Sequence, residues 1–247
     1  MCRLLAIKGE INQEELNLIL ENFQNQAITG RVPRGVTPGH QDGWGFSVYK
    51  KGQVALHKRS CKNASADFDY NKTKNKIIKI NGDIIIGHLR KASVGGVNKN
   101  NAHPFVYKNY SFCQNGKVID SEKIKIEAKF KKIIKGTTDS ERLFYFILGQ
   151  LELSKKLKYS FIQALKKIKN DFDYTAMNSV FSDGRQLLVT REINLKNEAI
   201  KKMKMVDYYS LFVGEKSDGS YKIIASEKMK IKNVKWRLLK NGEVIVI

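Results

Sequence analysis

The chain has 247 residues, of which 42% are hydrophobic, so it is long enough for one large domain or two small ones around an ordinary buried core. No segment approaches the roughly 18–20 apolar residues that span a bilayer, and the opening MCRLLAIKGE lacks a signal-peptide pattern, so we expect a cytoplasmic protein with no membrane partner. The formal net charge is +21, but the lysines are spread from Lys50 to Lys240 without a nucleic-acid-binding motif, which favours a solvated lysine-rich surface over a nucleic-acid or acidic partner.

Patterning over the first ninety residues predicts mainly strands, with one amphipathic helix. The helix is expected over Gln13–Gln26, because apolar residues recur there at offsets of three, four and seven. Two of the three prolines and several glycines make residues 29–42 a loop, and the polar segment 64–79 carries no pattern that assigns it. The expected strands are Cys2–Lys8, Gly45–Lys50, Gln53–Lys58 and Asp83–Arg90, with the middle two joined as a hairpin.

The rest of the chain is predicted to place two helices between two groups of strands. A loop over residues 91–104 leads to the strand Tyr110–Gln114, which is expected to stop at the turn pair Asn115-Gly116. The expected helices are Ser140–Leu151, capped by Thr138, Asp139 or Ser140, and Tyr159–Ile168. The later strands are Tyr174–Phe181, Gln186–Arg191, Tyr208–Val213, Tyr221–Ala225, Val234–Leu239 and Glu243–Ile247. This order favours an α+β fold of two packed sheets with helices outside.

Cys2 is the first candidate for chemistry. The three cysteines form no CxxC pair and the four histidines are scattered, so neither a disulfide framework nor a metal site is expected. A methionine before a small residue is normally cleaved, and the mature chain would then begin with a thiol beside a free α-amine. The reference pKa of such an amine is about 7.7–8.0, so it could accept the thiol proton near neutrality. The alternative is a small residue that simply starts a strand.

Further segments carry groups suited to amide chemistry. Arg90 ends a predicted buried strand and could either bind a carboxylate through two parallel hydrogen bonds or form a structural salt bridge. Asn115 and Gly116 could present an amide and a backbone N–H side by side as an oxyanion hole, or form a plain hairpin turn. Asp139 could hold a substrate ammonium, or it could serve only at a helix N-terminus.

Several segments together have the order and spacing of a known family, and the sequence resembles the class II glutamine amidotransferases, which are N-terminal-nucleophile hydrolases. The resemblance covers nearly the whole chain and implies a four-layer αββα sandwich of two mainly antiparallel sheets, with a single amidotransferase domain over residues 2–247. Weaker landmarks occur at Asp183-Gly184 and Ala225-Ser226-Glu227. The segments that carry the resemblance to the family are Met1-Cys2-Arg3, Asp42-Gly43-Trp44-Gly45, His88-Leu89-Arg90, Asn101-Ala102-His103-Pro104, Gln114-Asn115-Gly116 and Thr138-Asp139-Ser140-Glu141.

The resemblance implies roles for the matching positions. Cys2 would be the nucleophile and its amine the base, while the Asn115 side chain and the Gly116 N–H would form the oxyanion hole. The substrate-binding residues would be Arg90 for the α-carboxylate, Asp139 for the α-ammonium, and Ser93 and His103 in the wall of the glutamine pocket. No cofactor or metal is implied.

The sequence looks closest to stand-alone members with a DGWG segment, among which are hydrolases of γ-glutamyl amides and peptides. Two positions depart from common patterns: Gln114 stands where many members have histidine, and Lys91 stands where members fused to a sugar-phosphate synthase have tryptophan. We therefore expect hydrolysis of the γ-amide of glutamine or of a γ-glutamyl compound, with no synthase domain in this chain. The alternatives are a glutaminase subunit that delivers ammonia to a separate synthase, and a non-catalytic binding protein on the same fold. A homo-oligomer stays open.

Overall fold

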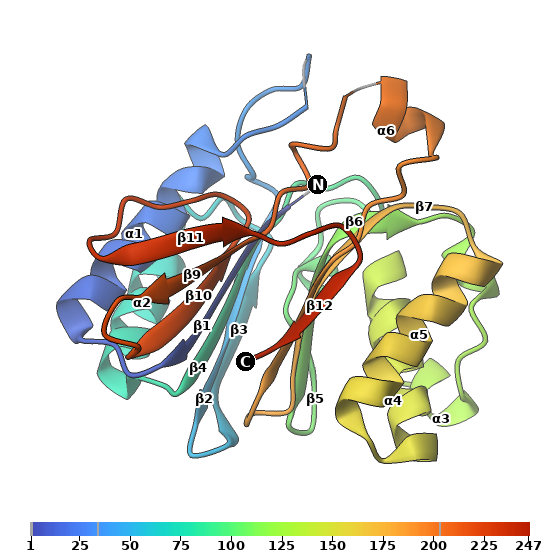
Figure 1. Cartoon of the computed structure of the whole chain (residues 1–247), viewed down its shortest axis with the longest axis horizontal. Coiled ribbons are helices and arrows are strands. Elements are labelled where there is room, and N and C mark those ends of the chain that lie inside the picture. The colour runs from blue at the N-terminus through green and yellow to red at the C-terminus, as the bar shows by residue number, and fades with distance from the viewer. Residues whose placement is uncertain (1, 34, 203) are drawn as a thin grey trace.

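The computed structural model describes residues 2–33, 35–202 and 204–247, which form two stacked sheets with helices on both outer faces (Figure 1). The layers run from α1 (Gln13–Thr29) and α2 (Phe68–Ile80), across the two sheets, to α4 (Asp139–Ser154) and α5 (Leu157–Asp171). The predicted α+β sandwich is confirmed. Among the helices of the described ranges, none is long and apolar enough to cross a membrane.

The first sheet places the N-terminal strand at its centre. Its strands follow the order β11-β9-β10-β1-β4-β2-β3, and all neighbouring pairs are antiparallel. Their bounds are β1 Arg3–Gly9, β2 Trp44–Lys50, β3 Gln53–Ser60, β4 Ile84–Leu89, β9 Phe212–Lys216, β10 Tyr221–Ala225 and β11 Val234–Leu238. The start of β1 and the end of β4 are therefore adjacent, since Arg3 pairs with Leu89.

The second sheet is also antiparallel and has the order β12-β8-β7-β6-β5. Its strands are β5 Phe105–Tyr107, β6 Tyr110–Val118, β7 Tyr174–Ser182, β8 Leu187–Arg191 and β12 Glu243–Val246. Short helical segments complete the described chain: η1 Lys99–Asn101, η2 Ser121–Lys123, α3 Ala128–Lys131 and α6 Glu198–Lys202.

Strand alternation on β1 decides which way Cys2 faces. Leu5 and Ile7 pack in the core beneath α1 and α2, whereas Leu4 and Ala6 pack between the two sheets. Successive side chains of a strand point to opposite faces, so Cys2, two residues before Leu4, is directed toward the second sheet. The nucleophile candidate thus lies at the end of the sandwich, where β1, β4 and β6 come together.

Three local predictions were wrong or incomplete. Asn115-Gly116 is not a turn, because β6 continues through both residues to Val118 with an irregular register at Gly116. The ninth strand is Phe212–Lys216 rather than Tyr208–Val213, since residues 204–209 form turns and the pairing with β10 and β11 begins at Phe212. The unassigned segment 64–79 holds α2, which begins at Phe68 after its N-cap and buries one apolar side against α1.

Candidate active site

Cys2 is buried directly before β1, with 8% of its surface exposed. Its backbone nitrogen donates a hydrogen bond of 2.9 Å to Asn115 Oδ1, and its Sγ lies 3.9 Å from the Lys91 carbonyl oxygen. Burial raises the pKa of the thiol, but the positive chain terminus, His88 and the Lys91 carbonyl together lower it further, to about 5 from an ordinary value of 9.0. Cys2 therefore sits in an environment that favours the thiolate, which is the nucleophilic form.

The partner of Cys2 on β6 is a fully buried amide. Because Asn115 Oδ1 accepts from the Cys2 nitrogen, the Nδ2 group of the same side chain points elsewhere, and it has no hydrogen-bond partner. Gly116 follows with φ +145°, and a Cβ added there would lie 1.8 Å from the Ala176 carbonyl oxygen, so only glycine fits. Asn115 Nδ2 is therefore a buried N–H donor without a partner, on the side chain that also accepts from the Cys2 nitrogen, and an oxyanion hole needs a donor of this kind.

Arg90 follows β4 and is 3% exposed. Its Nη1 and Nη2 donate to the carbonyl oxygens of Gly96 and Val94 at 2.6 and 2.7 Å, which folds residues 94–96 over the guanidinium. Its backbone is fixed by Gly43, whose carbonyl oxygen accepts from the Arg90 N–H at 2.8 Å. Asp42 adds a hydrogen bond from the Ala92 N–H at 2.7 Å, so the DGWG segment positions the end of β4.

Asp139 is the first residue of α4 and is 4% exposed. Thr138 caps the helix by accepting from the Glu141 N–H at 3.3 Å, and Asp139 Oδ2 accepts from the Val118 N–H at 2.8 Å. Burial raises the pKa of the carboxyl to about 6, although hydrogen bonds from the Val118 and Ser140 backbones oppose the shift. Asp139 thus carries a buried negative charge at neutral pH in the same region as the Arg90 cation.

The sequence-predicted site residues are brought together. Asn115 bonds the Cys2 nitrogen but does not line the cavity, which measures about 20 Å³ and has room for about one water molecule. Six of the predicted residues line this one cavity, namely Cys2, Arg90, Ser93, His103, Gly116 and Asp139, together with Lys91, Val94, Gln114, Thr138 and Ser140. The site therefore combines a thiol, the cations of Arg90 and Lys91, and the Asp139 carboxyl around one small cavity.

Arg3 holds the strand that presents Cys2, a role that sequence reasoning did not assign. Its buried guanidinium donates to the Cys2 carbonyl oxygen at 2.9 Å and also binds Glu227 and the Arg31 carbonyl. Ser226 Oγ accepts from the Leu4 N–H at 2.9 Å. The landmark Ala225-Ser226-Glu227 thus anchors the start of β1, and the charged and polar side chains there act on the position of the nucleophile.

His88 is a second residue that sequence reasoning left without a role. It lies on β4 and is fully buried, and its Nε2 is 2.7 Å from His103 Nδ1 and 3.3 Å from the Gln114 carbonyl oxygen. The two rings meet edge to face with centroids 4.1 Å apart. The segment His88-Leu89-Arg90 therefore places a guanidinium on the cavity wall and an imidazole against His103, which also lines the cavity, and the period-2 pattern of β4 was the available signal.

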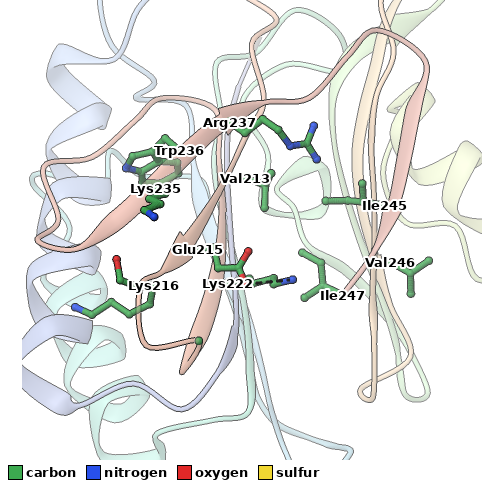
Figure 2. A pocket seen from close by; sticks show the side chains of 12 residues that line it. Val213, Glu215, Lys216, Lys222, Lys235, Trp236, Arg237, Ile245, Val246 and Ile247 are labelled. Carbon is green, nitrogen blue, oxygen red and sulfur yellow. Dashed lines mark ion pairs between the residues drawn. The ribbon is translucent and has the colours of Figure 1, made fainter.

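A larger cavity, of about 620 Å³, lies between the edge strands β11 and β12 and the strand β9 beside β11 (Figure 2). Three of the four cations that line it are paired within the chain: Lys216 binds Glu15 at 2.6 Å, Lys222 lies 3.7 Å from Glu215, and Arg237 pairs with Glu243 at 2.9 Å. The residues that line it include no cysteine, histidine, serine with a nearby base or buried carboxylate pair. This wider space therefore holds no thiol and no imidazole, in contrast to the small cavity at Cys2.

Comparisons with known proteins identify the family of the chain and similar folds. A family model described as class II glutamine amidotransferases matches residues 1–247. An uncharacterized protein of Methanocaldococcus jannaschii is 28% identical over 265 residues, covering 100% of this chain and 69% of that protein.

Two solved structures are similar in fold. A glutamine aminotransferase class-II domain protein from Silicibacter pomeroyi has a TM-score of 0.66 at 18% identity, covering 100% of this chain and 94% of that one. Glutamine phosphoribosylpyrophosphate amidotransferase from B. subtilis has a TM-score of 0.67 at 17% identity, covering 100% of this chain and 47% of that one. Both likenesses confirm the fold expected from the sequence.

Proposed function

The chain belongs to the class II glutamine amidotransferases, and from this premise we propose that it hydrolyses the γ-amide of glutamine or of a γ-glutamyl compound through a thioester on Cys2. The observation that supports this most is the pairing of Cys2 with Asn115, whose Oδ1 accepts from the Cys2 nitrogen while its Nδ2 has no partner. When Met1 is removed, that same nitrogen becomes the α-amine. Nucleophile, base and oxyanion donor would then lie within one hydrogen-bonded unit.

Charge in the cavity supports a glutamyl group as the part that is recognised. A glutamyl moiety carries one α-carboxylate and one α-ammonium at a fixed separation, and the cavity wall carries Arg90 and Asp139. The cavity is too small for this group as it stands, so the carbonyl oxygens of Val94 and Gly96 must give up the guanidinium to the substrate carboxylate. A substrate lacking either charge would leave a buried partner unpaired, which is costly.

The proposed reaction has two halves. The Cys2 thiolate attacks the γ-carbonyl carbon, and Asn115 Nδ2 with the Gly116 N–H holds the negative oxygen. The protonated α-amine gives its proton to the leaving nitrogen, and ammonia or an amine departs. Water, activated by the same amine, then attacks the thioester and releases the glutamyl product, which restores the thiol.

The identity of the leaving group distinguishes a glutaminase subunit from a stand-alone hydrolase. A glutaminase subunit that serves a separate synthase would release ammonia from glutamine, whereas a stand-alone hydrolase would release an amine from γ-glutamyl conjugates. The deciding assay measures ammonia and amine release from glutamine and a panel of γ-glutamyl amides and peptides. Efficient ammonia release that is restricted to free glutamine supports a glutaminase subunit. A preference for γ-glutamyl conjugates supports a stand-alone hydrolase.

The experiment that tests the proposed function uses Cys2→Ala. The variant should lose hydrolysis of every substrate on that panel while keeping its circular dichroism spectrum, because the side chain occupies little space. Cys61→Ala is the matched control, since Cys61 lies outside the cavity and is partly exposed. Turnover by the Cys2→Ala protein would refute the proposed function.

A further inference from the structure

A cavity of about 760 Å³ lies at the end of the sandwich where the chain begins. It is formed by residues 31–33, which follow α1, and by α6 with residues 204–208, and both segments lie at the end marked N (Figure 1). Its volume is within the range of about 300–1,000 Å³ that is usual for small-molecule sites. The cavity at Cys2 has room for about one water molecule, so a larger substrate must extend beyond it.

The wall of this second cavity combines positive charge with apolar surface. Arg31, Lys202 and Lys204 line it together with a single carboxylate, that of Asp207, and the remaining lining residues apart from Tyr208 are apolar. Neither lysine has an ion-pair partner within the described residues. Tyr208 is 6% exposed, and its hydroxyl has no hydrogen-bond partner in the same part of the chain. Such a wall suits a ligand with an anionic group on a partly apolar body.

Arg3 connects this cavity with the nucleophile. The Tyr208 ring lies against the Arg3 guanidinium, with Arg3 Cζ 4.7 Å from the ring centroid, and Arg3 Nη1 donates to the Cys2 carbonyl oxygen at 2.9 Å. The Arg31 carbonyl oxygen accepts a further hydrogen bond from Arg3 Nη2. Both sides of the cavity therefore contact the side chain that holds the backbone of Cys2.

The proposed reaction places the leaving group on this side of Cys2. The leaving nitrogen takes its proton from the α-amine of Cys2, so it must approach the backbone of that residue, while the glutamyl part lies between Arg90 and Asp139. The two contacts of 2.9 and 4.7 Å join the Cys2 carbonyl oxygen to the Tyr208 ring through Arg3. An extended peptide spans about 3.3–3.6 Å per residue, so a leaving amine of two residues or more is long enough to reach the cavity.

We infer that the cavity lined by Arg31, Lys202, Lys204 and Tyr208 binds the far end of the leaving group, and that this end carries a carboxylate. The substrates are then γ-glutamyl peptides with a free terminal carboxylate, which the three cations attract while the apolar wall contacts the intervening side chains. This inference rests on the proposed function, because a leaving group exists only if Cys2 cleaves a γ-glutamyl amide. It favours the stand-alone hydrolase over the glutaminase subunit.

The test compares kcat/KM for γ-glutamyl-alanyl-alanine and for its C-terminal amide, which have nearly the same size and differ in one charge. The natural protein should prefer the acid by about tenfold or more, the contribution of one charge-assisted hydrogen bond. In the double variant Lys202→Gln with Lys204→Gln this preference should fall toward one. Both lysines are exposed, so the substitutions should leave the fold intact, and circular dichroism checks this.

Lys201→Gln is the matched control. Lys201 lies on the same helix as Lys202 and pairs with Glu198 at 2.9 Å, but it does not line the cavity. The control is needed because a chain with a net charge of +21 attracts anions in general, whichever lysine is removed. The preference for the acid should be unchanged in this variant.

The outcomes are distinct. Equal kcat/KM for the acid and the amide in the natural protein, or activity on glutamine alone, overturns the inference but leaves γ-amide hydrolysis by Cys2 intact. A preference that survives in the double variant, or that falls equally in Lys201→Gln, overturns the assignment to this cavity. Stimulation of amide cleavage by free N-acetyl-alanyl-alanine would mark an effector site and overturn the leaving-group role. Hydrolysis that survives in Cys2→Ala would instead refute the proposed function itself.

Discussion

Asp139 provides a prediction in which stability and function oppose each other. Its carboxyl is 4% exposed, and burial raises its pKa to about 6 from 3.8. A shift of about two pH units corresponds to about 3 kcal/mol at 1.36 kcal/mol per unit. Because the folded protein holds this proton more tightly than the unfolded chain does, stability falls as the pH rises from about 4 to 6.

The variant Asp139→Asn removes the charge but keeps an oxygen that can accept from the Val118 N–H. We expect it to be up to about 3 kcal/mol more stable than the natural protein at pH 8, and equally stable near pH 3.5, where both side chains are neutral. At pH 8 this gain should raise the Tm by roughly 6–12 °C for a chain of this size.

Urea denaturation at the two pH values measures the free energy of unfolding directly. Asp171→Asn is the matched control, because Asp171 is exposed at the end of α5, and it should show no comparable gain. A stability difference between Asp139→Asn and the natural protein that is the same at pH 3.5 and pH 8 would refute the reasoning. The same variant should lose kcat/KM for glutamine by roughly 10–100-fold, since a charged hydrogen bond contributes about 1.5–3 kcal/mol.

Three further changes test the rest of the site. Asn115→Ala should lower kcat by ~10²–10³ with little change in KM, as measured by steady-state ammonia release; an unchanged kcat would remove Asn115 from the oxyanion hole. Arg90→Lys keeps the charge but loses the two parallel donors, so KM for glutamine should rise by about tenfold or more, and an unchanged KM in the same assay would contradict that role. Gly116→Ala places a Cβ 1.8 Å from the Ala176 carbonyl oxygen, so a lowered Tm and lost activity are expected; a variant as stable and active as the natural protein would show that the β6 irregularity is not required.

The sequence predicted the large elements well because their signals are local. The apolar spacing of α1 predicted that helix, and the three cap candidates Thr138, Asp139 and Ser140 placed the start of α4 to within one residue. By contrast α2 was missed, because its apolar residues are diluted by lysines, and the helix is stabilised by packing against α1 and the first sheet.

The sequence predicted most of the residues that were expected in the candidate site and that line its cavity together, but it did not predict how they are arranged. Asn115-Gly116 has the composition of a turn, yet β7 pairs with both residues and extends the strand, so tertiary pairing overrides local preference. The contact between His88 and His103 was not predictable, because it depends on how the end of β4 packs against the loop before β5. The closure of residues 94–96 over Arg90 likewise depends on backbone carbonyls, which no side-chain pattern reports.

The sequence favours a solvated lysine-rich surface as the explanation of the high positive charge. Several lysines pair with nearby carboxylates, including Lys74 with Glu21 and Lys58 with Asp69, each at 2.9 Å. An exposed pair such as Lys58 with Asp69 contributes little to stability. A gel-shift titration with nucleic acid across salt concentrations tests the interpretation, and specific retention at physiological salt would contradict it.

The central claim is that the α-nitrogen and the sulfur of Cys2 act together on an amide. Mass spectrometry of the purified protein after incubation with a glutamine-like alkylating analogue measures the N-terminus and the reactive residue at once. The account predicts a chain that lacks Met1 and carries one adduct on Cys2. A fully active protein that retains Met1, or an adduct on Cys61 with Cys2 untouched, would contradict it.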